Sequence, residues 1–446
     1  MQLRDRQGLP LTGASAASLD HYEAALHSLR CFIGDPLGAA DAAIAADPGF
    51  VMAHVFKGYL NGLSTEASAI PVAQACAEAA AALPATDRER AHVAALAHLA
   101  NGRWHQAGQA LEDISIEYPQ DALALQAGHQ IDFFTGNARM LRDRVARALP
   151  AWDQAMPGYH AVLGMHAFGL EETGEYALAE RTGKRAVEME PRDGWAQHAV
   201  AHVMEMQCRH EEGIAWMRAD TDAWTRDSFL QIHNWWHLAL FHFDLGQVDE
   251  VLALYDGPIS GLSGDIALNL VDESSLLWRL HLTGADCGNR WGPLADLWEK
   301  KAGASAYAFN DAHAMMAFVG AGRRAAAESL LDAQREALAS AGDNASFTRE
   351  VGQPVAIAIR AFGDGNYAET VRLLRPIRHI AHRFGGSHAQ RDAIDLTLVE
   401  AAIRSGNAAL SRALAAERLH ARPDSPLSRL FVERAQGLRK EIQNGH

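Results

Sequence analysis

Amphipathic helical segments recur along this chain with a period of about 34 residues, the length of a two-helix repeat. The clearest unit runs from His160 to Pro191. A turn at 174–177 separates its two helical segments, Ala179 and Ala186 allow close contact between them, and a proline ends the unit. One such unit cannot bury its own apolar face, so neighbouring units must stack. The recurrence therefore restricts the chain to an α-solenoid, a stack of helix pairs.

A second unit at 88–119 repeats the pattern, with Gly102 at the turn, Ala107 at the close contact and Pro119 at the end. Alanine and leucine are abundant and β-branched residues are sparse, which favours helices over strands. We predict an all-α fold, a right-handed α-solenoid of divergent tetratricopeptide repeats.

The predicted solenoid follows an extended lead-in over residues 1–13 and forms a single continuous domain over 14–446. The repeats are regular to about residue 250 and irregular after it. Apolar spacing still predicts helices beyond that point, roughly at 265–282, 306–320, 323–341, 348–362, 366–384, 388–405, 407–421 and 426–442. Trp291-Gly292-Pro293 is predicted to break the chain before another short helix.

The net charge of −15 and the lack of a basic block make nucleic acids and anionic membranes unfavourable partners. No apolar run has the length of a membrane span, and the first residues lack the apolar stretch of a secretion signal. The cysteines are scattered and form no CxxC motif, which is typical of a reducing compartment. We expect a cytoplasmic protein without structural disulfides.

Two histidine pairs, His198/His202 and His233/His237, have i,i+4 spacing. On a helix, both rings of such a pair leave one face, about 5–6 Å apart at Cβ. The second pair follows the first by about one repeat length, and equivalent helices of neighbouring repeats lie roughly 8–10 Å apart. The four imidazoles should therefore point into one small volume of the concave groove, with Glu205 on the same face.

This spacing suits Zn²⁺ or another divalent ion, with Glu205, Asp272 or Asp311 as supplementary carboxylates. Neither HAVAH nor HNWWH has the glutamate that follows the first histidine in the HExxH motif of metalloproteases. Two alternatives stay open: a metal-free polar pocket, and a structural network of hydrogen-bonded imidazoles. The candidate metal ligands are His198, His202, His233 and His237.

Further polar motifs supply the other candidates. Asp311 and His313 could form an acid–base dyad, and the alternative is that Asn310 or Asp311 caps a helix. Arg391 could clamp a substrate carboxylate, and the alternative is an intramolecular pair with an aspartate. The candidate catalytic residues are His202, His237, Glu205, Asp311 and His313. The candidate substrate-binding residues are His198, His233, Trp236, Asp272, Asn310 and Arg391, with Asp272 alternatively a dipole partner at a helix start.

The chain resembles the tetratricopeptide repeat protein 38 family over nearly its whole length. The resemblance lies in long polar motifs in a fixed order: RERAHV at 88–93, FGLEET at 168–173, HAVAHVMEM at 198–206, HNWWHLAL at 233–240, VDESSLLWRL at 271–280, FNDAH at 309–313, LLRPIR at 373–378 and GGSHAQRD at 385–392. His160, His166 and His242 fall outside this pattern. The resemblance implies the repeat fold and a common purpose for the polar positions, but no catalytic assignment.

Two classes of function follow. The first is a pocket in the groove that binds a small molecule or short peptide, or acts as a hydrolase or lyase, with a divalent metal as its possible cofactor. In this hypothesis the segment 385–392 approaches the histidines. The second is a protein-interaction scaffold with a structural polar network and no catalysis. A homo-oligomer is compatible with both. No P-loop, GxGxxG or GxSxG motif indicates nucleotide or serine chemistry.

Overall fold

The computed structural model describes residues 3–301 and 303–444, with side chains described as far as residue 438. Within these ranges every regular element is a helix, and only two isolated bridges pair extended backbone, Arg4 with Pro10 and Ile33 with Ser228. The all-α prediction is therefore confirmed. The contacts divide the chain into two compact units. The first contains residues up to Val200, with Asp220–Gln231 and Ala341–Asp343; the second contains Ala201–Ala219, Ile232–Ser340 and the residues from Asn344 on.

The first unit is built from helix pairs joined by short turns. Its elements are α1 (Ala16–Cys31), α2 (Pro36–Ala46), α3 (Val51–Gly62), η1 (Ala67–Ala69), α4 (Ile70–Ala81), α5 (Asp87–Ala100), α6 (Trp104–Glu117), α7 (Ala122–Phe134), α8 (Ala138–Ala148), η2 (Leu149–Ala151), α9 (Tyr159–Glu172), α10 (Tyr176–Met189) and α13 (Thr221–Thr225). α11 (Gly194–Met206) crosses the division between the units.

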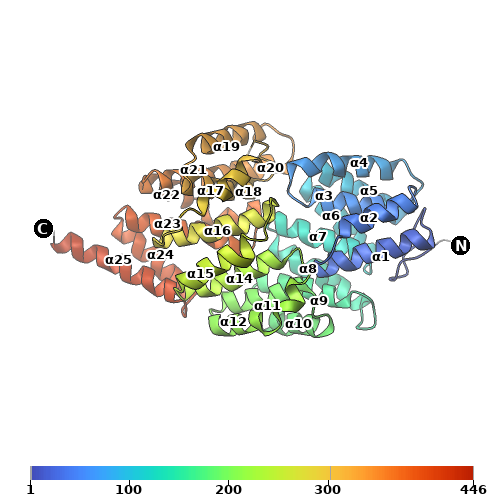
Figure 1. The fold of residues 1–446 in the computed structure, drawn as a ribbon, viewed down its shortest axis with the longest axis horizontal. Coiled ribbons are helices and arrows are strands. Elements are labelled where there is room, and N and C mark those ends of the chain that lie inside the picture. Colours follow the sequence, from blue (N-terminus) through green and yellow to red (C-terminus); the bar gives the residue numbers. More distant parts are fainter. Residues whose placement is uncertain (1–2, 302, 445–446) are drawn as a thin grey trace. The chain divides into compact units, whose positions relative to one another are not determined.

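Packing in the first unit follows the chain. Each helix from α2 to α9 packs against the helix before it and the helix after it, and Figure 1 shows α3 to α6 as neighbouring pairs. The predicted repeats at 88–119 and 160–191 correspond to α5–α6 and α9–α10. Ala107 and Ala179 are fully buried in them, which lets the paired helices approach closely.

The second unit continues with longer-range packing. Its elements are α12 (His210–Ala219), α14 (Gln231–Asp244), α15 (Val248–Leu254), η3 (Tyr255–Ile259), α16 (Ala267–Thr283), α17 (Trp291–Glu299), α18 (Ala308–Gly320), α19 (Arg324–Ala337), α20 (Asp343–Phe347), η4 (Thr348–Gly352), α21 (Gln353–Gly363), α22 (Tyr367–Leu374), η5 (Arg378–Phe384), α23 (His388–Arg404), α24 (Ala408–Ala421) and α25 (Pro426–Asn444). Besides their chain neighbours, α16 packs on α23 and α18 on α21.

Most helices predicted beyond residue 250 are confirmed within a few residues, with two corrections. The segment predicted as one helix over 366–384 is split into α22 and η5, because Pro376 cannot continue an α-helix. Trp291-Gly292-Pro293 does not precede a helix but begins α17, since a proline is tolerated in the first turn. Among the described residues, no helix is long and apolar enough to cross a membrane.

The start of α23 is fixed by a capping box. Ser387 Oγ accepts from the backbone N–H of Gln390, whose side chain accepts from the Ser387 N–H. We expect Ser387→Ala to lower the free energy of unfolding by about 1 kcal/mol, because it leaves a buried helix-end N–H without its acceptor. Ser387→Gly should lower it by only a few tenths of a kcal/mol. Urea denaturation followed by circular dichroism measures both, and equal losses in the two variants would contradict a capping role.

Candidate functional site

Three of the four predicted histidines come together within the second unit. His202 lies on α11, and His233 and His237 lie one turn apart on α14. Their ligand nitrogens lie within 4.8 Å of one another. The ring centroids of His202 and His237 are 4.4 Å apart, and those of His233 and His237 are 4.9 Å apart. The repeat spacing in the sequence thus brings side chains of two helices into one small volume.

His198 lies one helical turn before His202, in the part of α11 that belongs to the first unit. Its imidazole is buried there against Trp195 and Phe168, with ring centroids 4.7 and 5.2 Å away. The participation of His198 in a four-histidine group stays a prediction.

Two carboxylates orient the imidazoles of α14. His237 Nδ1 lies 3.1 Å from Glu205 Oε2, and His233 Nδ1 lies 2.9 Å from Asp272 Oδ2. With Nδ1–H donating to a carboxylate, Nε2 carries the lone pair of each neutral ring. This carboxylate–histidine pairing is the arrangement that fixes the tautomer of metal-binding histidines.

Burial controls the protonation of the group. Desolvation, followed by the neighbouring His237, holds the pKa of His202 well below its ordinary value. Desolvation also lowers the pKa of His237, followed by the effects of His233 and Arg279. Burial raises the pKa of Glu205. The Arg422 guanidinium, 3.8 Å from the Glu205 carboxylate, opposes this rise. His202 and His237 are therefore neutral at pH 7, the form in which an imidazole binds a metal.

Trp236 and Arg279 pack beside the histidine group. The Trp236 ring stacks on His233 with centroids 5.3 Å apart, and its Nε1–H donates to Ser275 Oγ at 2.9 Å. The Arg279 guanidinium lies 5.3 Å from the centroid of the Trp236 ring. Trp236 is fully buried, so it packs against the imidazoles and offers no open surface for stacking in this structure.

The segment 385–392 reaches α16 through Arg279, which donates to Ala389 O at 2.5 Å. Burial lowers the pKa of Arg279 to about 10, so it keeps its charge at pH 7. Arg391 contacts Gly386 O and lies 3.5 Å from His388 Nδ1. The predicted role of Arg391 as a carboxylate clamp stays a prediction.

The alternative, an intramolecular pair of Arg391 with an aspartate, also stays a prediction, and the neighbouring Asp392 binds another arginine. Asp392 accepts two hydrogen bonds from Arg418, at 2.6 and 2.9 Å. The sequence could not reveal this partner, because Arg418 comes from α24, a different helix.

Asp311 and His313 sit on α18 but bind different partners. Asp311 Oδ2 accepts from Ser305 Oγ at 2.6 Å and from Gln334 Nε2 at 3.2 Å. His313 Nδ1–H donates to Phe309 O at 2.8 Å. Burial raises the pKa of Asp311 to about 6 and lowers that of His313 to about 4. Residues two apart on a helix do not share a face, so the described contacts of this pair form no acid–base dyad.

Both helix-start alternatives are also wrong. α18 begins at Ala308, with Asn310 and Asp311 inside its first turn, and Asn344 Oδ1 accepts from the Ala308 N–H. Asp272 is not at a helix start either, because α16 begins at Ala267. Its carboxylate is instead committed to His233.

Sequence reasoning missed two cations of this region, Arg279 and Arg422. Arg279 lies two turns after Asp272 within VDESSLLWRL, and that spacing on one helix face could have revealed it. Arg422 follows α24 and is more than two hundred residues from Glu205 in the chain. No local pattern connects residues at that separation.

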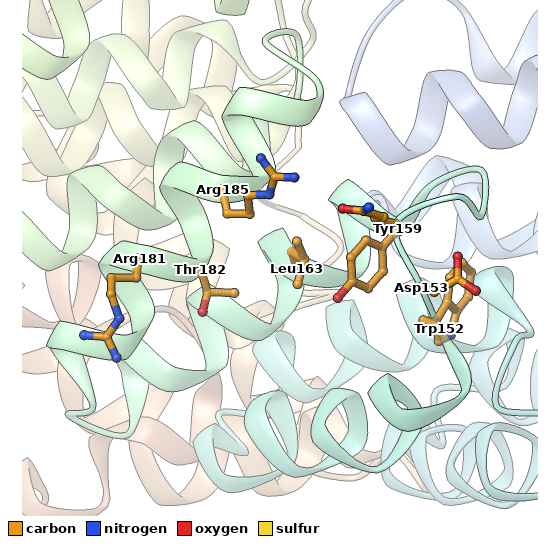
Figure 2. A pocket seen from close by; sticks show the side chains of 8 residues that line it. Trp152, Asp153, Tyr159, Leu163, Arg181, Thr182 and Arg185 are labelled. Carbon is orange, nitrogen blue, oxygen red and sulfur yellow. The ribbon is translucent and has the colours of Figure 1, made fainter.

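A hollow of about 500 Å³ lies elsewhere, in the first unit. Figure 2 shows Tyr159 and Leu163 of α9 beside Arg181 and Arg185 of α10, with Trp152 on the segment that precedes α9. None of the predicted site residues lines this hollow. The histidine group is enclosed instead, since His202 and His237 have no exposed surface.

No protein-family model matches this chain. Any function must therefore be argued from the chemistry of the group itself, and the resemblance in sequence motifs stays a proposal.

Proposed function

We propose that the second unit binds a divalent metal ion of the zinc type on His202, His233 and His237, and that the protein is a metal-assisted hydrolase or lyase for a small molecule. The observation that carries the proposal is the pair of carboxylate–histidine contacts, Glu205 with His237 and Asp272 with His233, beside a third buried imidazole. Neutral, pre-oriented imidazoles are what a zinc ion requires of its ligands.

His202, His233 and His237 would hold the ion through three nitrogens. When bound, a zinc-type ion would supply Lewis-acid chemistry and a water of lowered pKa at neutral pH. Glu205, whose pKa burial raises, is the acid–base group beside the ion. Arg422 and Arg279 supply positive charge close to Glu205 for a developing anion.

Metal binding by the untagged full-length protein tests the proposal. We expect one zinc ion to be retained by this group. His202→Ala and His237→Ala should each abolish its binding, and Asp272→Asn should weaken it roughly 10–100-fold because the orienting charge on His233 is lost. Isothermal titration with Zn²⁺ after treatment with a chelator measures the affinities.

His242→Ala is the matched control. His242 is also a buried histidine of α14, but its Nδ1 bonds to Gln247. It does not belong to the group of His202, His233 and His237. It should leave the zinc affinity unchanged. The same number of bound zinc ions in the His202→Ala/His237→Ala double variant as in the wild type would contradict the proposal.

The reaction class has its own measurement. Hydrolysis of a panel of carboxylic esters, phosphoric esters and lactones is compared with and without zinc. Turnover that needs zinc and is lost in His237→Ala supports the hydrolase or lyase. If zinc binds but no probe is turned over, the protein binds a metal but is not the proposed hydrolase or lyase.

A protein-interaction scaffold is the second candidate. It is favoured by the full burial of His202 and His237, which leaves only part of His233 for a substrate to contact in this structure. In a scaffold the imidazoles form a structural network, so their removal lowers stability by about 1–3 kcal/mol for each partner left unsatisfied and removes no metal. Thermal denaturation in parallel with the zinc titration separates the two functions.

The proposal includes the type of helical repeat and the cellular location of the protein. Sequential packing of helix pairs in the first unit supports a right-handed solenoid of tetratricopeptide repeats. The four cysteines are free and buried, which supports a cytoplasmic location.

A further inference from the structure

A second group of side chains that could bind a metal ion lies within the first unit, at the ends of helices that are far apart in the chain. Cys31 is the last residue of α1, His160 is the second residue of α9, and Glu190 follows α10. One ligand atom from each lies within 4.8 Å of the other two. Cys31 and His160 are buried, and Glu190 is half-buried. Tertiary packing therefore collects a thiol, an imidazole and a carboxylate in one place.

A carboxylate orients the imidazole of this group as well. His160 Nδ1 lies 2.7 Å from Asp193 Oδ2, and Asp193 is fully buried. The other oxygen of Asp193 accepts from the Ala196 N–H at 2.9 Å, which holds the carboxylate at the start of α11. With Nδ1–H donating to Asp193, Nε2 is the ring nitrogen that would coordinate an ion.

The charge of this group suits a cation. The Glu190 carboxylate lies at the Cys31 thiol and the His160 imidazole, and the Asp193 carboxylate lies behind that imidazole. A divalent cation would pair directly with Glu190 and through His160 with Asp193, and it would replace the thiol proton of Cys31.

Two arginines that act electrostatically on Cys31, Arg30 and Arg192, have side-chain contacts with other residues. Arg30 reaches Gln7 Oε1, at 3.5 Å. Arg192 donates to Arg226 O at 2.9 Å and lies 3.8 Å from Asp227. Their charges act on Cys31 only more weakly than burial and the carboxylates do.

We propose that Cys31 Sγ, His160 Nε2 and the Glu190 carboxylate bind a zinc-type ion, with water in the fourth position. A mixed sulfur, nitrogen and oxygen set is a ligand set that zinc accepts. The ion joins the end of α1 to the start of α9 and to the turn before α11, and its binding releases the thiol proton to solvent. This site is independent of the histidine group in the second unit.

Cobalt titration of the untagged, reduced full-length protein tests this site. A thiolate bound to Co²⁺ gives a sulfur-to-metal charge-transfer band in the near ultraviolet, and an all-imidazole site gives none. We expect this band in the wild type, its loss in Cys31→Ser, and its retention in the His202→Ala/His237→Ala double variant. Failure of the function proposed above would therefore leave this test intact.

If Cys31→Ser folds poorly, the variant Asp193→Asn provides a second test of the proposed metal site. Asparagine still accepts the Ala196 N–H and so keeps the cap of α11. It removes the charge that orients His160, and we expect cobalt affinity at the sulfur band to fall roughly 10–100-fold. Cys76→Ser, a change at another buried cysteine, is the control and should keep the wild-type affinity.

Two results would overturn the proposal. One is the lack of a sulfur band in the wild type at saturating cobalt. The other is an unchanged band in folded Cys31→Ser, which would assign the signal to a different cysteine.

Discussion

Replacement of Arg144 by methionine should lower the free energy of unfolding by about 3–5 kcal/mol, the usual effect of leaving a buried charge without its partner. Arg144 lies on α8 with only 1% of its side chain exposed. Its Nε and Nη2 donate to the two carboxylate oxygens of Asp132 on α7, at 2.7 and 3.1 Å, and Nη2 also reaches Gly108 O of α6. The guanidinium thus joins three consecutive helices, and Arg144→Met leaves Asp132 buried without a cation.

Chemical denaturation of the variant measures this loss. Arg139→Met is the matched control, because Arg139 lies on the same helix and pairs with Asp143 at an exposed position. It should change stability by less than about 1 kcal/mol. In the double variant Arg144→Met/Asp132→Leu, most of the loss should be recovered, since an apolar pair of similar volume replaces the ion pair. A loss under 1 kcal/mol in Arg144→Met would contradict the buried pair.

Acidification from pH 7 to pH 5 should remove about 2 kcal/mol of stability through His129 alone. His129 lies on α7, 1% exposed, with its ring against Phe168 and Trp195. Burial, followed by the charge of Arg144, lowers its pKa to about 3, against an ordinary value of 6.5. The unfolded chain therefore takes up the proton first as the pH falls. The contribution of His129 is complete above pH 6.5 and is lost as the pH falls from there towards 3.

The test compares the pH dependence of stability between variants. In His129→Leu the difference in unfolding free energy between pH 7 and pH 5 should be about 2 kcal/mol smaller than in the wild type. The remaining dependence comes from other buried histidines, such as His202 and His237. His21→Leu, at an exposed position of α1, should leave the wild-type difference in place. Parallel curves for His129→Leu and wild type would show that the pKa of His129 does not differ between the folded and the unfolded protein.

The sequence by itself determined the helices and most of their ends. Apolar periodicity, the turns at Gly102 and Gly174 and the terminal prolines are local features, and each acts on residues within one or two turns of itself. The same local physics explains the two errors. Pro376 ended a helix that periodicity alone would have continued, and Pro293 was read as a break although its place in a first turn is favourable.

The repeat spacing also predicted that His202, His233 and His237 would converge, because a helical period and a repeat period together fix which faces meet. Their carboxylate partners were only partly predictable. Glu205 lies one turn after His202, and that spacing indicated it. The contact of Asp272 with His233 joins two different helices, α16 and α14, and no spacing within one helix indicates it.

Only the tertiary structure decided the remaining partners. Arg422 beside Glu205, Arg418 on Asp392, and Cys31 near His160 join residues that no periodicity relates. It also decided that His202 and His237 are fully buried and that one hollow is lined by residues of α9 and α10. The physical reason is that burial and long-range pairing depend on how whole helices pack, whereas a sequence pattern reports only which face of each helix is apolar.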